Sequence, residues 1–432
     1  MPDVRFPYGR QELTVSIPDD RYAGTLTARM PRGENEALLV REAMAHPLGS
    51  PSLAELARGK RKVVLIASDH TRPVPSRLLI PPMLAAIRAG NPNAEITILI
   101  ATGCHRETTK EELIGKFGPE IAAKERIVVH DCDDEANLVS LGTLPSGGEL
   151  VINRLAAEAD LLVAEGFIEP HFFAGFSGGR KSVLPGVAAR RTVMYNHNSR
   201  FIADPRCRTG ITAGNPIHED MLFAAQRAGL AFVLNVVINA EKEVVMAAAG
   251  EPEAVHAAGR RFLLDRCRVK AIPSDIVITT NGGYPLDQNI YQSVKGMTAA
   301  EATVRKGGVI VMFSRCGDGH GGKRFYETFR DEKDLDRMTD GFLRTPPEKT
   351  VPDQWQSQIL ARVLKKADVI LVSDAPDGIV SDLHLIPAHS PEEALTLADR
   401  RLAERGIRNG GILAVPDGVS VIVSAEEGET PL

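Results

Sequence analysis

The sequence has few cysteines, no long apolar run and no excess of charge of one sign. Five cysteines are scattered over 432 residues, and no Cys-x-x-Cys motif occurs. An odd, dispersed set makes a poor disulfide framework, so we expect a reduced protein of the cytoplasm. No apolar run approaches the roughly 18 residues of a membrane span. The N-terminal segment also lacks the apolar core of a signal peptide.

The charge balance argues against nucleic-acid binding. Lysine and arginine number 51 and the acidic residues 56, which gives a formal net charge of −5 with both signs interspersed. A general polyanion binder would usually carry a strong basic excess. The remaining composition, 43% apolar and 25% charged, is typical of soluble globular proteins. The length predicts two or three domains.

Short β-branched runs alternate with longer amphipathic stretches along the chain. The runs predict strands over residues 63–68, 96–101, 127–130, 161–164, 275–280, 308–313, 368–373 and 412–415. The stretches predict helices over residues 76–89, 107–117, 252–269 and 391–405. A proline pair, Pro81 and Pro82, should kink the first helix or delay its start. This rhythm predicts an α/β fold with mostly parallel sheets and helices on both faces.

A domain boundary is expected near residue 270, where a short connector follows the long helix over residues 252–269. We therefore predict two α/β domains, residues 1–270 and 275–432, with the active site in the inter-domain cleft. Alternatively, the last strand and the tail pack with the first domain. Only residues 426–432 suggest disorder.

The strongest local feature is the glycine-rich segment from His171 to Ser182, HFFAGFSGGRKS, which follows a predicted strand. Its glycines leave backbone N–H groups able to approach an anion closely. The segment nearly matches the phosphate loop G-x-x-x-x-G-K-[ST], but Arg180 stands in place of the second glycine. A nucleoside triphosphatase is therefore disfavoured. A different phosphate cradle and a tight turn with an exposed Arg-Lys pair both remain open.

Other polar side chains follow predicted strands or lie on predicted helices. Asp69 and Arg72 come directly after the strand over residues 63–68, and His105 follows the next strand. α/β folds place ligands at such carboxyl ends, and Arg72 could bind a carboxylate or phosphate through two hydrogen bonds. His197 ends a Tyr-Asn-His segment on a predicted helix.

A further pair, Gln292 and Lys295, shares one face of a predicted helix. Together these groups suit a small anionic substrate. The three histidines could instead form a zinc site, although no compact spacing such as H-E-x-x-H is present. A non-catalytic binder of phosphorylated ligands is the third alternative.

Taken together, the motifs resemble the lactate racemase family that uses the nickel-pincer nucleotide cofactor. The resemblance covers most of the chain and rests on the joint order and spacing of the motifs. These are SDHTRP from Ser68, GCHR from Gly103, H-x-x-x-GFSGG-x-K from His171, Asn196-His197 and YQSVK from Tyr291. The single tryptophan, Trp355, also falls where the family has one near its site.

The resemblance implies how the cofactor is held. Lys181 would be covalently joined to it, a pyridinium-3-thioamide-5-thiocarboxylic acid mononucleotide. His197 would be the protein ligand of its nickel, which is reasonable beside sulfur and carbon donors in a square plane. The cofactor phosphate would be held by Ser177, Gly178 and Gly179.

The resemblance also implies the substrate contacts. His105 and His171 would be the two acid/base groups, one for each enantiomer. Arg72 would bind the substrate carboxylate, with Asp69 supporting the site. The other expected substrate-binding residues are Gln292, Lys295, Tyr291 and Trp355.

The implied reaction is racemisation of a short, lactate-like 2-hydroxy acid by proton-coupled hydride transfer to the cofactor. The alternatives with the same chemistry are a malate racemase and a sugar-acid 2-epimerase. A dicarboxylate needs a second cation beyond Arg72, for which Arg180, Arg106 and Lys295 are candidates. The expected partners are the substrate and the cofactor-synthesis enzymes, with no nucleic acid or membrane.

Overall fold

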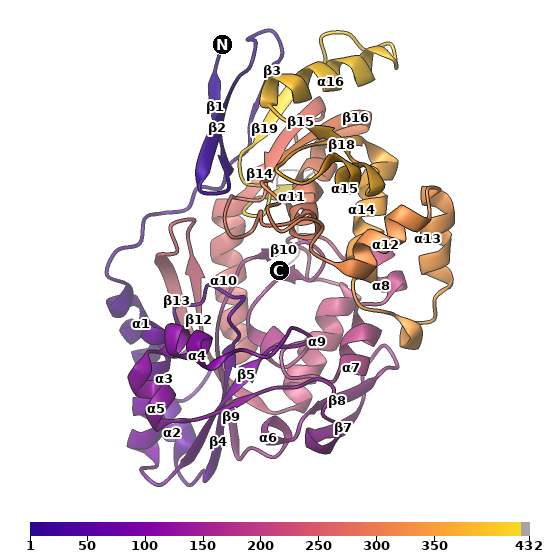
Figure 1. Cartoon of the computed structure of the whole chain (residues 1–432). Coiled ribbons are helices and arrows are strands. Elements are labelled where there is room, and N and C mark those ends of the chain that lie inside the picture. The colour runs from indigo at the N-terminus through magenta and orange to yellow at the C-terminus, as the bar shows by residue number, and fades with distance from the viewer. Residues whose placement is uncertain (425–432) are drawn as a thin grey trace. The chain divides into compact units, whose positions relative to one another are not determined.

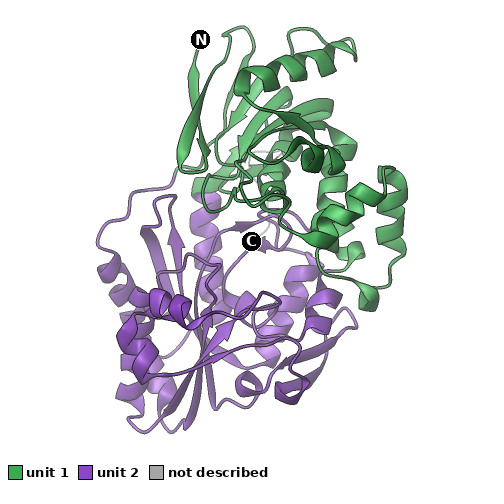
Figure 2. Ribbon diagram, viewed as in Figure 1, with its two compact units in different colours: residues 1–29, 198–204, 266–431 green, residues 30–197, 205–265, 432 purple. Residues whose placement is uncertain are grey.

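The computed structural model describes residues 1–424, and the chain divides into two compact units (Figure 1). Unit 1 contains residues 1–29, residues 198–204 and the chain from residue 266 onward, and unit 2 contains residues 30–197 and 205–265 (Figure 2). The expected disordered segment over residues 426–432 lies outside the described residues. Within residues 1–424, no helix combines the length and apolar character needed to cross a membrane.

Unit 2 is built on a six-stranded sheet with the order β13-β12-β9-β4-β5-β6. Its strands are β4 (Lys62–Ser68), β5 (Glu95–Ala101), β6 (Arg126–Val129), β9 (Leu161–Phe167), β12 (Leu230–Ile238) and β13 (Val244–Gly250). Neighbouring strands are parallel except for β12 and β13, which are antiparallel. The chain first lays down β4, adds β5 and β6 on one side, and then places β9 and β12 on the other. The strand order therefore reverses between β4 and β9, where open α/β sheets bind ligands.

The helices of unit 2 are α1 (Glu36–Ala45), α2 (Leu53–Ala57), α3 (Ser76–Gly90), α4 (Lys110–Phe117), α5 (Pro119–Lys124), α6 (Arg154–Ala157), α7 (Arg190–Asn196), α9 (Pro216–Arg227) and most of α10 (Pro252–Cys267), with short 3₁₀ turns η1 (Glu135–Asn137) and η2 (Gly179–Ser182). Two small antiparallel pairs complete it, β7 (Leu138–Thr143) with β8 (Glu149–Asn153) and β10 (Pro170–His171) with β11 (Gly175–Phe176). The core packs apolar residues of β4, β5, β9 and β12 against α3. α3 begins at Ser76 with both prolines inside it, so its start is not delayed.

Unit 1 is built on a second six-stranded sheet with the order β18-β17-β16-β15-β19-β3, in which all neighbours are parallel. Its strands are β3 (Tyr22–Thr25), β15 (Ser274–Thr280), β16 (Val304–Phe313), β17 (Asp368–Val372), β18 (Ile386–Ala388) and β19 (Ile412–Val415). Its helices are α8 (Ser199–Ala203), α11 (Ile290–Thr303), α12 (Lys323–Asp331), α13 (Leu335–Arg344), η3 (Pro347–Lys349), α14 (Gln354–Lys366), α15 (Asp377–Asp382) and α16 (Pro391–Ala403). The hairpin of β1 (Asp3–Tyr8) and β2 (Gln11–Ser16) and the pair of β14 (Arg268–Lys270) and β20 (Ile422–Ser424) also belong to it.

The α/β class and the mostly parallel sheets predicted from the sequence are confirmed, and each predicted strand is present within a few residues. The compact units also contain segments that the boundary near residue 270 does not separate. β3 is an edge strand beside β19, so residues 1–29 group with the C-terminal half. Strand pairing of this kind is set by distant partners, which local periodicity does not reveal.

Candidate functional site

The loop that follows β4 is hydrogen-bonded to the neighbouring strand β9, at the point where the strand order reverses. Glu165 of β9 is buried, and its Oε1 accepts hydrogen bonds from Ser68 N at 2.8 Å, Ser68 Oγ at 2.9 Å and Ser76 Oγ at 3.2 Å. These bonds hold both ends of the loop over residues 68–76. Glu165 was not among the predicted site residues, because its only signal is an acidic residue within an otherwise apolar strand.

Asp69 and His105 form a pair at the carboxyl ends of the adjacent parallel strands β4 and β5. His105 Nδ1 donates to Asp69 Oδ2 at 2.7 Å, and Thr71 Oγ1 donates to Asp69 Oδ1 at 2.7 Å. Asp69 is 1% exposed. Burial works to raise the pKa of Asp69, but the bonds from His105 and Thr71 and the charge of Arg72 outweigh it and hold that pKa below its usual value. The carboxylate therefore stays ionised and keeps the His105 proton on Nδ1, so that Nε2 carries the lone pair.

Arg72 lies on the same loop, and its side chain is exposed. Its backbone N–H donates to Asp69 O at 3.3 Å, so the turn that positions Asp69 also positions Arg72. Arg72 lines a cavity of about 840 Å³ together with His70 and Lys116. Neither His105 nor the glycine-rich segment lines this cavity.

The segment after β9 brings His171, Phe173 and Lys181 together. His171 and Gly175 face each other in the β10–β11 pair, which folds the segment back on itself. The amine of Lys181 lies 3.0 Å from His171 Nε2 and 5.7 Å from the centre of the Phe173 ring. Ala174 N–H donates to His171 Nδ1 at 3.3 Å, which assigns the ring proton to Nε2.

His197 contacts the other edge of this cluster through Phe173. Its ring centre lies 5.2 Å from that of Phe173 in an edge-to-face arrangement, and its side chain is buried. His197 directly follows α7, so the prediction that it lies on a helix is off by one residue. Nδ1 donates to Val193 O at 3.0 Å, which leaves the lone pair on Nε2. Burial, aided by the charge of a protonated Lys181, lowers the pKa of His197 to about 3. It is therefore neutral at pH 7, as a metal ligand must be.

The glycine turn before Lys181 is held by internal hydrogen bonds. Ser177 Oγ accepts from Glu169 N and donates to Phe167 O, while Gly179 N donates to Asn235 Oδ1 at 2.8 Å. Gly178 has φ of +78°, and a Cβ there would lie 2.8 Å from Phe167 O, so only glycine fits. To hold a phosphate, Ser177 and Gly179 would have to exchange these bonds for new ones.

Arg180 does not form an exposed pair with Lys181, because its side chain is buried with only 2% of its surface exposed. Its guanidinium donates to Ala174 O at 2.9 Å, to Ser177 O at 3.2 Å and to His256 Nε2 at 2.6 Å. The sequence alternative of an exposed Arg-Lys pair is therefore wrong. Arg180 instead fixes the backbone between His171 and Lys181.

The remaining predicted substrate-binding residues lie on two packed helices of unit 1. Gln292 and Lys295 are one turn apart on α11, which Asn289 caps by accepting a hydrogen bond from Gln292 N at 3.0 Å. Tyr291 O accepts a hydrogen bond from Gln356 of α14, the helix that also carries Trp355. α11 and α14 thus bring all four residues into one part of unit 1.

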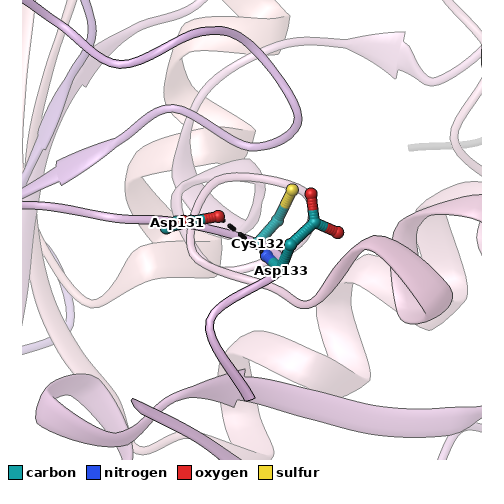
Figure 3. A group of neighbouring side chains, drawn as sticks. All are labelled: Asp131, Cys132 and Asp133. Atoms are coloured by element: carbon teal, nitrogen blue, oxygen red, sulfur yellow. Dashed lines mark hydrogen bonds between the residues drawn. The ribbon is translucent and has the colours of Figure 1, made fainter. Parts of the chain in front are cut away.

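The three histidines do not form a zinc site. Among residues 1–424, the group with metal-binding spacing is Asp131, Cys132 and Asp133 (Figure 3). Its carboxylates are already engaged, because both oxygens of Asp133 accept from Arg190 at 2.8 and 2.6 Å, and Asp131 Oδ1 accepts from Asp133 N. This group therefore gives no support to the zinc-hydrolase alternative.

Comparisons with known proteins match this chain to lactate racemases over nearly its whole length. The family model for the lactate racemase N-terminal domain matches residues 8–210, and that for the lactate racemase C-terminal domain matches residues 269–423. The chain is 50% identical to a lactate racemase of Thermoanaerobacterium thermosaccharolyticum over 428 residues, which is 98% of this chain and 99% of that protein. It is 48% identical to a lactate racemase of Lactiplantibacillus plantarum, over 97% of this chain and 99% of that protein.

Two solved structures are also similar to this chain. The lactate racemase apoprotein from Thermoanaerobacterium thermosaccharolyticum matches with a TM-score of 0.94 at 50% identity, covering 98% of this chain and all of that chain. A protein from Thermotoga maritima matches with a TM-score of 0.61 at 19% identity, covering 88% of this chain and all of that one, which indicates a shared fold.

Proposed function

The chain belongs to the lactate racemase family and is an isomerase, and we propose that it interconverts the two enantiomers of lactate. The observation that carries this proposal is the cluster of Lys181, His171 and His197 around Phe173, directly after β9. Across the reversal of strand order, the loop after β4 supplies Asp69 and the neighbouring β5 supplies His105.

The residues present fit a nickel-pincer nucleotide covalently attached at Lys181. A thioamide forms through the nitrogen of an amine, and Lys181 presents its amine 3.0 Å from His171 Nε2. His197 is neutral and buried, and a backbone carbonyl accepts from its Nδ1, the pattern usual for metal-ligating histidines. When bound, this cofactor would supply a hydride acceptor.

The chain's own residues move the hydroxyl proton and hold the carboxylate. We propose that His105 takes this proton at Nε2 from one enantiomer, since Asp69 holds its other nitrogen. We propose that His171 is the acid/base group for the opposite enantiomer. Arg72, on the same loop as Asp69, would bind the carboxylate through two charge-assisted hydrogen bonds. We also propose that Gln292, Lys295, Tyr291 and Trp355 bind the substrate.

Two of the three cations that could bind a second carboxylate are already engaged, which favours lactate over malate. Arg180 is buried against backbone carbonyls, and Arg106 forms a two-point ion pair with Glu112 at 2.6 and 2.9 Å. A dicarboxylate would therefore bring its second charge to a site with fewer available partners.

The proposed function is tested by producing the protein together with the cofactor-synthesis enzymes, the partners we expect in the cytoplasm, and following L-lactate by chiral chromatography. The account predicts conversion to an equal mixture of enantiomers, with no conversion by Lys181→Ala. Lys323→Ala is the matched control, because Lys323 is 84% exposed and its nearest carboxylate oxygen is 4.0 Å away. Full activity of Lys181→Ala would overturn the proposal.

A further inference from the structure

Arg180 is a buried cation that has no carboxylate hydrogen-bonded to it in the described part of the chain. All its hydrogen-bond acceptors are neutral, namely the carbonyls of Ala174, Ser177 and Gly178 and the imidazole of His256. A buried charge without an ionic partner destabilises the fold. The fold therefore leaves part of the charge of Arg180 uncompensated.

A cavity of about 30 Å³ lies beside Arg180, and His218 and Arg260 also line it. Each of these three side chains has one buried nitrogen without a hydrogen-bond partner, namely Arg180 Nε, Arg260 Nε and His218 Nδ1. Buried polar atoms in native proteins nearly always have partners. Two of the three are guanidinium N–H groups, which can only donate.

The surroundings of the cavity favour negative charge inside it. Pro252 and Glu253, the first residues of the 16-residue helix α10, line the cavity, and helix N-termini attract anions. Two carboxylates also lie in the lining. Glu253 is exposed, and its charge acts on Arg260 and not on Arg180. Glu251 is engaged, since its Oε2 accepts from Ala254 N–H at 2.7 Å.

At pH 7 the charges of Arg180 and His218 suit a bound anion. Burial, and next the charge of Arg260, lower the pKa of Arg180 to about 9. Arg180 still carries its charge at pH 7. His218, whose pKa burial and the two arginines lower to about 3, is neutral there and able to donate one hydrogen bond.

We propose that Arg180, Arg260 and His218 form a binding site for a single monatomic anion of chloride size. A water molecule needs roughly 10–15 Å³ of such space, so a cavity of about 30 Å³ has room for a monatomic anion. The anion would accept from the three unpartnered nitrogens and balance the charge of Arg180. Since Arg180 fixes the backbone between His171 and Lys181, the anion would stabilise the segment that carries both residues.

The first test measures thermal unfolding of the apoprotein in sodium chloride and in sodium gluconate at equal ionic strength. We expect chloride to raise the Tm of the wild type by about 3 °C, as a ligand present at several times its Kd would. Arg260→Gln should abolish this response. Arg41→Gln, which changes an exposed arginine of α1, is the matched control and should respond as the wild type does. An equal response of wild type and Arg260→Gln would overturn the proposal.

The second test uses the unchanged protein and so does not depend on the folding of a variant. Crystals grown in sodium bromide should show an anomalous scattering peak within hydrogen-bond distance of Arg180 Nε and Arg260 Nε. Ordinary water in the cavity, with no anomalous peak there, would overturn the proposal. Both readouts are independent of catalysis, so their failure would leave the proposed racemase activity untouched.

Discussion

The amine of Lys181 lies 3.0 Å from Nε2 of His171, and both groups contact the ring of Phe173. This relationship joins the proposed point of cofactor attachment to a proposed acid/base group. Ten residues separate the two along the chain, and the β10–β11 pair and the buried Arg180 close that distance. The glycine-rich segment therefore acts to position two functional groups, and its glycines permit the tight backbone path.

The two histidines should be individually essential. Each is proposed to serve one enantiomer, and racemisation passes through both, so His105→Ala and His171→Ala should each lower kcat about 10²- to 10⁴-fold. The measurement is the initial rate from each enantiomer with protein carrying equal amounts of cofactor. His46→Ala changes a histidine whose side chain is 78% exposed and should leave the rate unchanged. A loss of less than tenfold in either site variant would remove that histidine from the proposed role.

Phe173 should matter to catalysis beyond its contribution to packing. Its ring meets His171 at 4.5 Å and His197 at 5.2 Å, so Phe173→Leu removes the surface that orients both imidazoles. We expect covalent cofactor to be retained and kcat to fall about tenfold. Phe6→Leu alters a buried edge-to-face pair with Phe313 in unit 1 and serves as the control, with loss of stability but not of kcat in the folded fraction. Equal kcat values for the two variants would contradict this role.

Asp69 should contribute to catalysis by fixing the tautomer of His105. Its carboxylate accepts the hydrogen bond from His105 Nδ1, so Asp69→Asn should lower kcat about tenfold or more by removing this constraint. The measurement is kcat for lactate, with about the same cofactor content in both proteins. An unchanged kcat in Asp69→Asn would contradict this role.

Asp69 should also contribute to acid stability, with a sign fixed by its pKa. Folding lowers that pKa, so the ionised carboxylate stabilises the fold above its unfolded pKa of about 3.9. This contribution is lost as the pH falls through the lower pKa of the folded state. Urea unfolding should find Asp69→Asn less stable than the wild type by about 1–2 kcal/mol at pH 7, and the difference should shrink as the pH falls below about 4. A difference that persists unchanged at low pH would contradict the assignment.

The α/β architecture was predictable because apolar periodicity reports each strand and helix locally. Joint motif spacing also brought out His171, Lys181 and His197, which the structure places around one phenylalanine. Phe173 itself and Glu165 escaped notice, because one aromatic and one acidic residue within apolar runs carry no local signal. The burial of the Arg180 side chain could not be predicted either, because it depends on packing against His256 of helix α10, which lies 76 positions later in the chain.

The substrate preference follows from that buried arginine. With Arg180 and Arg106 both engaged, kcat/KM for lactate should exceed that for malate by at least tenfold, about the effect of one missing charge-assisted hydrogen bond. The measurement compares both acids under identical conditions by chiral chromatography. A higher kcat/KM for malate would show that Lys295 or another cation fulfils the role of the second partner.

Intact mass and nickel content should be measured on protein produced together with the cofactor-synthesis enzymes, because they show whether Lys181 carries a nickel-pincer nucleotide. We expect a nucleotide-sized adduct mapped to Lys181 with about one nickel per chain, and neither in Lys181→Ala. Unmodified, nickel-free protein, obtained while a control racemase is loaded in parallel, would contradict this expectation.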